Sequence, residues 1–185
     1  FNIAGTFYKA IGKLDKALQS FENAIAIEPD FDAAHFNLGL TLQNLDQLDA
    51  AVKHYEQALA INPNHVLAYY NLSDIKQYTM SDDQVSIMES LLSNSNLSQS
   101  ERIHLCFALA KVNENLGKQD ELFKFLHEGN RLRKEELNYS HNKSQDLSSN
   151  VRELFNSLPS NIEKSLSYEP STIRPIFIVG MPRSG

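Results

Sequence analysis

The sequence predicts an all-α protein built from consecutive helical hairpins, and three observations support this fold class. Residues 32–63 contain two segments of helical length joined by a short turn. Apolar residues recur in both segments at the three- and four-residue spacing of an amphipathic helix. The preceding residues repeat the same pattern, and 42% of the chain is hydrophobic, enough for a buried core.

The repetition is visible in small, aromatic and proline residues that lie 34 residues apart. Small residues allow two helices to approach closely, and a larger side chain there would overpack the contact at a cost of about 1–3 kcal/mol. Pro63 is expected to end the second helix, with Asn62 outside the helical region. The matched pairs are Gly5 and Gly39, Tyr8 and Leu42, Ala17 and Ala51, Phe21 and Tyr55, Ala24 and Ala58, and Pro29 and Pro63.

This period, with its order of small, aromatic and proline positions, resembles the tetratricopeptide repeat. The resemblance implies antiparallel helix pairs that stack into a right-handed superhelix. We expect a domain over residues 1–137 with about four repeats: 1–31, 32–65, a degenerate 66–99, and 100–137, whose long last helix caps the stack. Because Phe1 falls partway into the first helix of a repeat, we expect the chain to be a fragment.

The third and fourth units follow the pattern less closely. Ser81 and Ser98 are predicted to cap helices, and Glu101 would complete a capping box with Ser98. The third unit begins regularly with Tyr69, Leu72 and Ser73, but its second half departs from the pattern at Val85, Glu89 and Leu92. In the fourth unit, we expect Leu122, Leu126 and Gly129 at the packing positions of Ala51, Tyr55 and Ala58.

Composition argues against several classes of function. A net charge of −6 disfavours nucleic acid or an anionic membrane as the main partner. Cys106, the single cysteine, is expected in the core, which favours a reducing compartment such as the cytoplasm. His127 and Glu128 begin a metalloprotease-like motif, but Arg131 stands where the second histidine would be required, and we expect no metal site.

The composition changes twice after the repeats. Residues 138–174 are polar and predict a linker with one short helix at 147–158. Residues 175–185 begin with an apolar, β-branched run that is typical of a strand buried on both faces of an α/β sheet. A glycine-bounded loop follows, and such loops bind phosphate through their backbone N–H groups.

Residues 176–185 resemble the 5′-phosphosulfate loop of sulfotransferases; their sequence is Ile-Phe-Ile-Val-Gly-Met-Pro-Arg-Ser-Gly. The resemblance is closer to the protein-tyrosine and bacterial types than to the cytosolic small-molecule enzymes. Together with the repeats, this run resembles the bacterial tetratricopeptide-repeat sulfotransferases. The resemblance implies the first strand and loop of a truncated α/β domain whose co-substrate is 3′-phosphoadenosine 5′-phosphosulfate. Gly180, Arg183, Ser184 and Gly185 would bind that donor. The rest of its site and the general base would lie beyond Gly185, so the fragment itself should not catalyse sulfuryl transfer.

Three alternatives remain open from the sequence. The parent protein is a sulfotransferase whose repeats present a protein or glycan substrate, or the chain is a non-enzymatic scaffold for protein binding. A P-loop kinase or triphosphatase is the third alternative, because Gly180 to Gly185 also fits the first half of the P-loop motif, G-x-x-x-x-G. The residues after Gly185 would distinguish these.

Asn37 and Asn71 occupy identical positions of successive first helices. In the repeat domain of a protein-glycosylating transferase family, asparagines at this position form a ladder that grips an extended peptide in the concave groove. We therefore predict partner binding at Asn37 and Asn71, with an ordinary helix-surface role as the alternative. Asn2 is one position out of register with this ladder.

Overall fold

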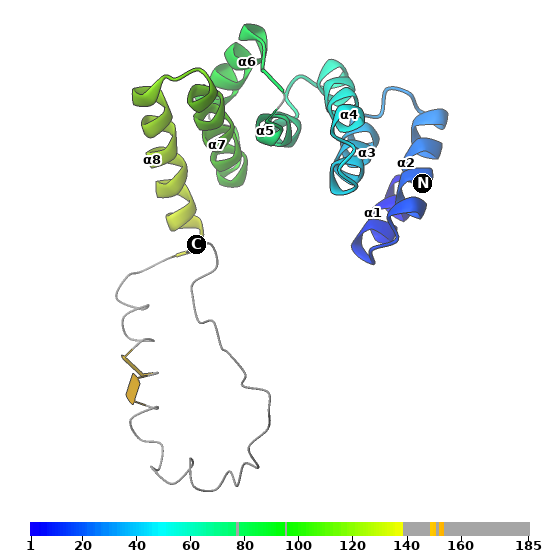
Figure 1. Cartoon of the computed structure of the whole chain (residues 1–185), viewed down its shortest axis with the longest axis horizontal. Helices are drawn as coiled ribbons and strands as arrows, with labels where there is room; N and C mark the ends of the chain where they lie inside the picture. The colour runs from blue at the N-terminus through cyan, green and yellow to red at the C-terminus, as the bar shows by residue number, and fades with distance from the viewer. Residues whose placement is uncertain (77, 95, 139–148, 151, 154–185) are drawn as a thin grey trace, which may run out of the picture. The chain divides into compact units, whose positions relative to one another are not determined.

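A computed structural model describes residues 1–76, 78–94, 96–138, 149–150 and 152–153. Internal contacts divide the chain into two units, Phe1–Tyr139 and Ser140–Gly185. Within the second unit, residues 149–150 and 152–153 are helical and fall inside the predicted helix 147–158, whereas the predicted strand and loop at 175–185 lie outside the described residues. In the first unit, Figure 1 shows helices that follow one another in chain order: α1 (Asn2–Ala10), α2 (Leu14–Ile27), α3 (Asp32–Asn44), α4 (Leu48–Ile61), α5 (Val66–Asp74), α6 (Asp82–Ser93), α7 (Gln99–Asn115) and α8 (Gln119–Glu136).

The first two hairpins, α1–α2 and α3–α4, use the same packing contact. A Cβ atom added to Gly39 would lie 2.9 Å from the ring of Tyr55, which is fully buried. At the equivalent place in the first hairpin, a Cβ on Gly5 would lie 2.5 Å from the ring of Phe21. The sequence prediction of a close helix approach at these glycines is therefore confirmed, because only a residue without a side chain leaves room for the ring.

The turns of three hairpins also share one conformation. Gly12, Asp46 and Gly117 each follow a first helix and have positive φ angles of 73°, 59° and 70°. A left-handed residue reverses the chain within a few residues, and glycine adopts it without steric cost. In the described part of the third unit, no residue has this conformation.

The third unit differs in its helix lengths and in its packing. Helix α5 has 9 residues and α3 has 13, so α5 lacks the last turn of its counterpart. Helix α5 packs mainly against α7 and only lightly against α6, which in turn contacts α7. Figure 1 shows α6 set off from α5. The core side chains of α6 are Met88 and Leu91, whereas Val85 and Leu92 are half-buried.

In the fourth unit, the glycine lies on the second helix and the aromatic ring on the first, the reverse of the first two hairpins. A Cβ on Gly129 of α8 would lie 3.1 Å from the ring of Phe107 and 3.2 Å from Cβ of Cys106, both on α7. Gly129 is buried as predicted, but Leu122 and Leu126 are only half-buried. Leu122 and Leu126 still pack against the core from its edge, while the buried face of α8 consists of Phe125, Gly129 and Leu132.

Capping side chains begin the helices of the irregular region. The Ser98 hydroxyl accepts from the Glu101 N–H, and Glu101 accepts from the Ser98 N–H at 2.9 Å, which confirms the predicted capping box. Ser81 forms a second box with Gln84, a partner that was not predicted. These contacts satisfy backbone donors that the first turn of a helix leaves without partners.

The two end helices of the first unit have contrasting surfaces. Helix α1 exposes Ile3 and Phe7, and its C-cap residue Ile11 is exposed as well; the three retain 86%, 61% and 48% of their accessible surface. Helix α8 instead carries ion pairs, including Arg131 with Glu128 at 2.7 Å and with Glu135 at 2.6 Å. In the described part of the chain, no helix combines the length and the apolar character that crossing a membrane requires.

Candidate peptide-binding surface

A cavity of about 460 Å³ lies where the N-terminal ends of α3, α5 and α7 meet. The α4–α5 turn contributes the Asn62 and Asn64 side chains to its wall. The remaining walls come from the start of each helix, and the lining residues are polar except for two aliphatic side chains: Asp32, His65, Val66, Leu67, Ser98, Ser100, Glu101 and His104. No lysine or arginine is among them.

Local folding holds the cavity residues in place. Asp32 accepts a hydrogen bond from Nδ2 of Asn62 at 2.7 Å, which ties the α4–α5 turn to the start of α3. Glu101 accepts from Ser98, and these hydrogen bonds lower the pKa of its carboxyl group. Both carboxylates are therefore held in place by hydrogen bonds within the fold.

His65 forms the N-cap of α5, a contact that the sequence did not reveal. Its Nδ1 accepts from the Ala68 N–H at 3.3 Å. Its ring also lies against Phe36 of α3, with 4.6 Å between ring centroids. Burial lowers the pKa of His65, although the Asp32 carboxylate acts in the opposite direction. Histidine is not among the usual capping residues, so the position carries no sequence signal.

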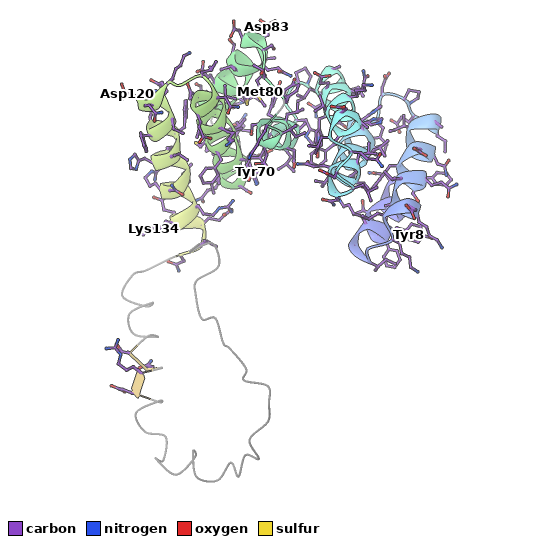
Figure 2. The ribbon with its side chains drawn as sticks, in the orientation of Figure 1. Tyr8, Tyr70, Met80, Asp83, Asp120 and Lys134 are labelled. Atoms are coloured by element: carbon purple, nitrogen blue, oxygen red, sulfur yellow. The ribbon has the colours of Figure 1, made fainter. Side chains whose placement is uncertain are left out.

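Tyr70 and His104 connect α5 to α7. Their rings meet edge to face with 4.9 Å between centroids, and Figure 2 labels Tyr70 on α5. Burial lowers the pKa of His104, and Arg133 on α8 lowers it further. Both rings lie on first helices of successive units, at positions that the 34-residue pattern does not mark, so sequence reasoning had no ground to pair them.

The predicted asparagines lie on α3 and α5 and are both half-buried. Nδ2 of Asn37 donates to Oδ1 of Asn2 at 3.1 Å, so Asn2 meets Asn37 despite being one position out of register. Nδ2 of Asn71 donates to the Leu67 carbonyl of its own helix at 2.8 Å. Among the described residues, neither side chain has a partner for its carbonyl oxygen or its second N–H. Peptide binding by this pair stays a prediction.

The other predicted site residues, Gly180, Arg183, Ser184 and Gly185, lie outside the described residues, and their phosphosulfate role stays a prediction. In the part of the chain that the structure describes, no three histidine, cysteine or carboxylate side chains are grouped so that they could hold a metal ion. Cys106 is fully buried as predicted, and burial raises the pKa of its thiol to about 11.

Comparison with known families finds tetratricopeptide repeats in this chain. The Tetratricopeptide repeat family matches residues 33–65. A second family, described as TPR repeat, matches residues 5–46. The two matches together span residues 5–65, from within α1 to past the end of α4, and so fall on the regular hairpins of the structure.

A relative and a solved structure are similar over a longer part of the chain. An uncharacterized protein of Aquifex aeolicus (strain VF5) is 32% identical over 112 residues, which are 60% of this chain and 14% of that protein. This chain therefore corresponds to a small part of that relative. The crystal structure of MamA superposes with a TM-score of 0.56 and 21% identity, over 73% of this chain and 77% of that one. At this identity, the likeness shows a shared fold.

Proposed function

We propose that the first helices of the repeats bind an extended segment of a partner protein. Tetratricopeptide repeats imply a protein-interaction scaffold, and the observation that carries the finer proposal is the pair Asn37 and Asn71. These residues lie on α3 and α5 at equivalent positions, each with an amide oxygen and one N–H that have no partner among the described residues.

An asparagine side chain can pair with a peptide unit in both directions. Its amide N–H donates to a peptide carbonyl, and its oxygen accepts from a peptide N–H. Each such hydrogen bond contributes about 0.5–1.5 kcal/mol, so several contacts are needed for micromolar affinity. The cavity beside α5 and α7 offers a further place for a polar side chain of the bound segment.

The test uses a defined probe. Peptides of random sequence are selected by display against this chain, and the enriched peptide is titrated calorimetrically into the protein. The double variant Asn37→Ala, Asn71→Ala should weaken binding at least about tenfold, which corresponds to about 1.4 kcal/mol. The matched control is Asn23→Ala, an exposed asparagine of the second helix α2.

Because Asn37 also binds Asn2 within the fold, Asn2→Ala is measured separately. It should leave peptide affinity within about twofold if Asn37 acts directly on the peptide. Equal peptide affinity of the double variant and the wild type would show that Asn37 and Asn71 do not bind the peptide. If no peptide can be enriched, the scaffold proposal itself fails.

We also propose, from the sequence resemblance at residues 175–185, that the parent protein is a sulfotransferase. The observation that favours it is Arg183, which stands between proline and serine-glycine after an apolar run. A longer form of the protein that continues past Gly185 is titrated with 3′-phosphoadenosine 5′-phosphate. Micromolar binding that is weakened in Arg183→Ala is expected, and no binding to the folded longer protein would reject this second proposal.

A further inference from the structure

A chain of hydrogen bonds runs through two histidines of the second hairpin and fixes where their protons lie. Nε2 of His35 lies 3.0 Å from the carbonyl oxygen of Pro29 in the α2–α3 turn. A carbonyl only accepts, so Nε2 of His35 carries the proton and its Nδ1 is an acceptor when the ring is neutral. Nδ1 of His54 on α4 lies 3.2 Å from that atom and must donate to it.

The third histidine of this region depends on a lone pair in the same way. Nδ1 of His65 accepts from the N–H of Ala68 and thereby caps α5. The ring of His65 rests on Phe36, which also contacts Tyr55 with 5.7 Å between centroids. The cap of α5 and the core of the second hairpin are thus in direct contact.

The surroundings of two of these rings, His54 and His65, favour their neutral forms. Burial lowers the pKa of His54, and His35 on the facing helix lowers it further. Burial likewise lowers the pKa of His65, against the opposing effect of Asp32 on α3. His35 itself is almost fully buried, with 7% of its surface exposed. These are the titratable groups of the neighbouring elements that act on the two rings.

We propose that His35, His54 and His65 form an acid-sensitive joint that holds α5 on the α3–α4 hairpin at neutral pH and loosens as the pH falls. The proposal is independent of what the protein binds. It rests on two acceptor nitrogens, Nδ1 of His35 and Nδ1 of His65, whose hydrogen bonds are lost if those atoms take up a proton.

Protonation has a different consequence at each site. A proton on Nε2 of His54 leaves its Nδ1–H as a donor, so the hydrogen bond to His35 is kept, whereas a proton on Nδ1 of His35 places two N–H groups face to face. A proton on Nδ1 of His65 removes the acceptor for Ala68 and uncaps α5.

The sign of the pH effect follows from the lowered pKa values. In the unfolded chain, histidine titrates near about 6.5, above the folded values of His54 and His65. The stabilisation is complete above that pH and is lost as the pH falls from about 6.5 through the folded pKa values. Between these limits, each proton taken up on unfolding lowers the folding equilibrium constant about tenfold per pH unit.

The experiment compares urea unfolding at pH 7.5 and pH 5.5. The double variant His54→Asn, His65→Asn removes both titrating rings, and asparagine is itself a good N-cap. His127→Asn, at an exposed position of α8, is the matched control. The wild type and the control should lose more in folding equilibrium constant over this range than the double variant does, up to about a hundredfold for two rings over the one pH unit below about 6.5.

A second readout is local and does not depend on the double variant. In an NMR titration of the wild type, the Cε1–H signals report the histidine pKa values, and the Ala68 amide shift should follow the titration of His65. Titration of His54 and His65 at or above about 6.5 would overturn the proposal. An identical pH dependence of stability in the wild type and the double variant would overturn it as well. If the double variant does not fold, His65→Asn alone replaces it, with half of the expected difference on a logarithmic scale.

Discussion

The second and third units have similar first halves in sequence and different structures. In the second unit, α3 has 13 residues, its Gly39 admits the ring of Tyr55, and Asp46 turns the chain directly into α4. In the third unit, α5 stops after 9 residues and packs mainly on α7 instead of α6. The comparison shows that a hairpin needs its glycine–aromatic contact and its left-handed turn together.

The fourth unit supports this view because it restores both features in another form. Gly117 provides the left-handed turn, and Gly129 receives the ring of Phe107 from the opposite helix. What a hairpin requires is therefore one small residue opposite one ring, whichever helix carries each. Four predictions test this comparison between the regular hairpins and the third unit.

The largest effect is expected from removing the ring of the second hairpin. Tyr55→Ala should lower the free energy of unfolding by about 3–5 kcal/mol, because the ring is fully buried against Gly39 and Phe36. The comparison in α6 is Val85→Ala, since the position equivalent to Tyr55 there is Glu89; Val85 is half-buried and its truncation should cost about 1 kcal/mol or less. Urea unfolding measures the free energy of unfolding of both variants, and equal losses would contradict the expected difference between the second and third units.

A smaller effect is expected from adding a methyl group at the close contact. In Gly39→Ala, the new Cβ would be 2.9 Å from the Tyr55 ring and 3.2 Å from the backbone oxygen of Ala51. Overpacking of about 1–3 kcal/mol exceeds the gain in helix propensity of about 1 kcal/mol, so the variant should be less stable.

Gly129→Ala is the comparison for this change, because its nearest neighbour is a ring edge at 3.1 Å on half-buried Phe107. The ring has room to move, so the stability should stay within about 1 kcal/mol of the wild type. Thermal unfolding gives the two values. A larger loss at Gly129 than at Gly39 would show that the fourth unit is the more tightly packed one.

The capping box at the start of α7 should contribute less than the core contacts. Ser98→Ala removes the acceptor of the Glu101 N–H and should cost about 1 kcal/mol. Ser93→Ala is its control, since the Ser93 hydroxyl is exposed and only donates to Glu89 of its own helix at 3.0 Å. That control should change stability by about 0.5 kcal/mol or less.

The smallest expected change is a stabilisation at the turn of the second unit. Asp46 holds a φ of 59°, where the equivalent turn of the first unit has Gly12. Asp46→Gly should raise the free energy of unfolding by about 0.5–1 kcal/mol, because relief of backbone strain exceeds the added chain entropy. The reverse change, Gly12→Asp, should lower it by a similar amount, and a loss on Asp46→Gly would mean that the aspartate side chain supports the turn.

The sequence predicted the regular hairpins because the residues that form them follow recognisable spacings along the chain. Gly39 and Tyr55 lie in a repeated pattern, and Ser98 with Glu101 forms a capping motif, so residue spacing was sufficient. The extensive packing of α5 on α7 was not predictable in this way, because it depends on where α5 ends and on which helix then packs against it. The contacts of Asn2 with Asn37 and of Tyr70 with His104 were missed as well, because each joins first helices of successive units at positions that the repeat pattern does not mark.

Native-state hydrogen exchange tests the central claim most directly, because it reports the opening free energy of each helix in the unaltered protein. If the third unit is a broken hairpin between regular ones, amides of α6 should exchange through local opening well before those of α3 and α4. Exchange of α6 only together with α3 and α4 would contradict the account, because it would show that the third unit is as firmly packed as the second.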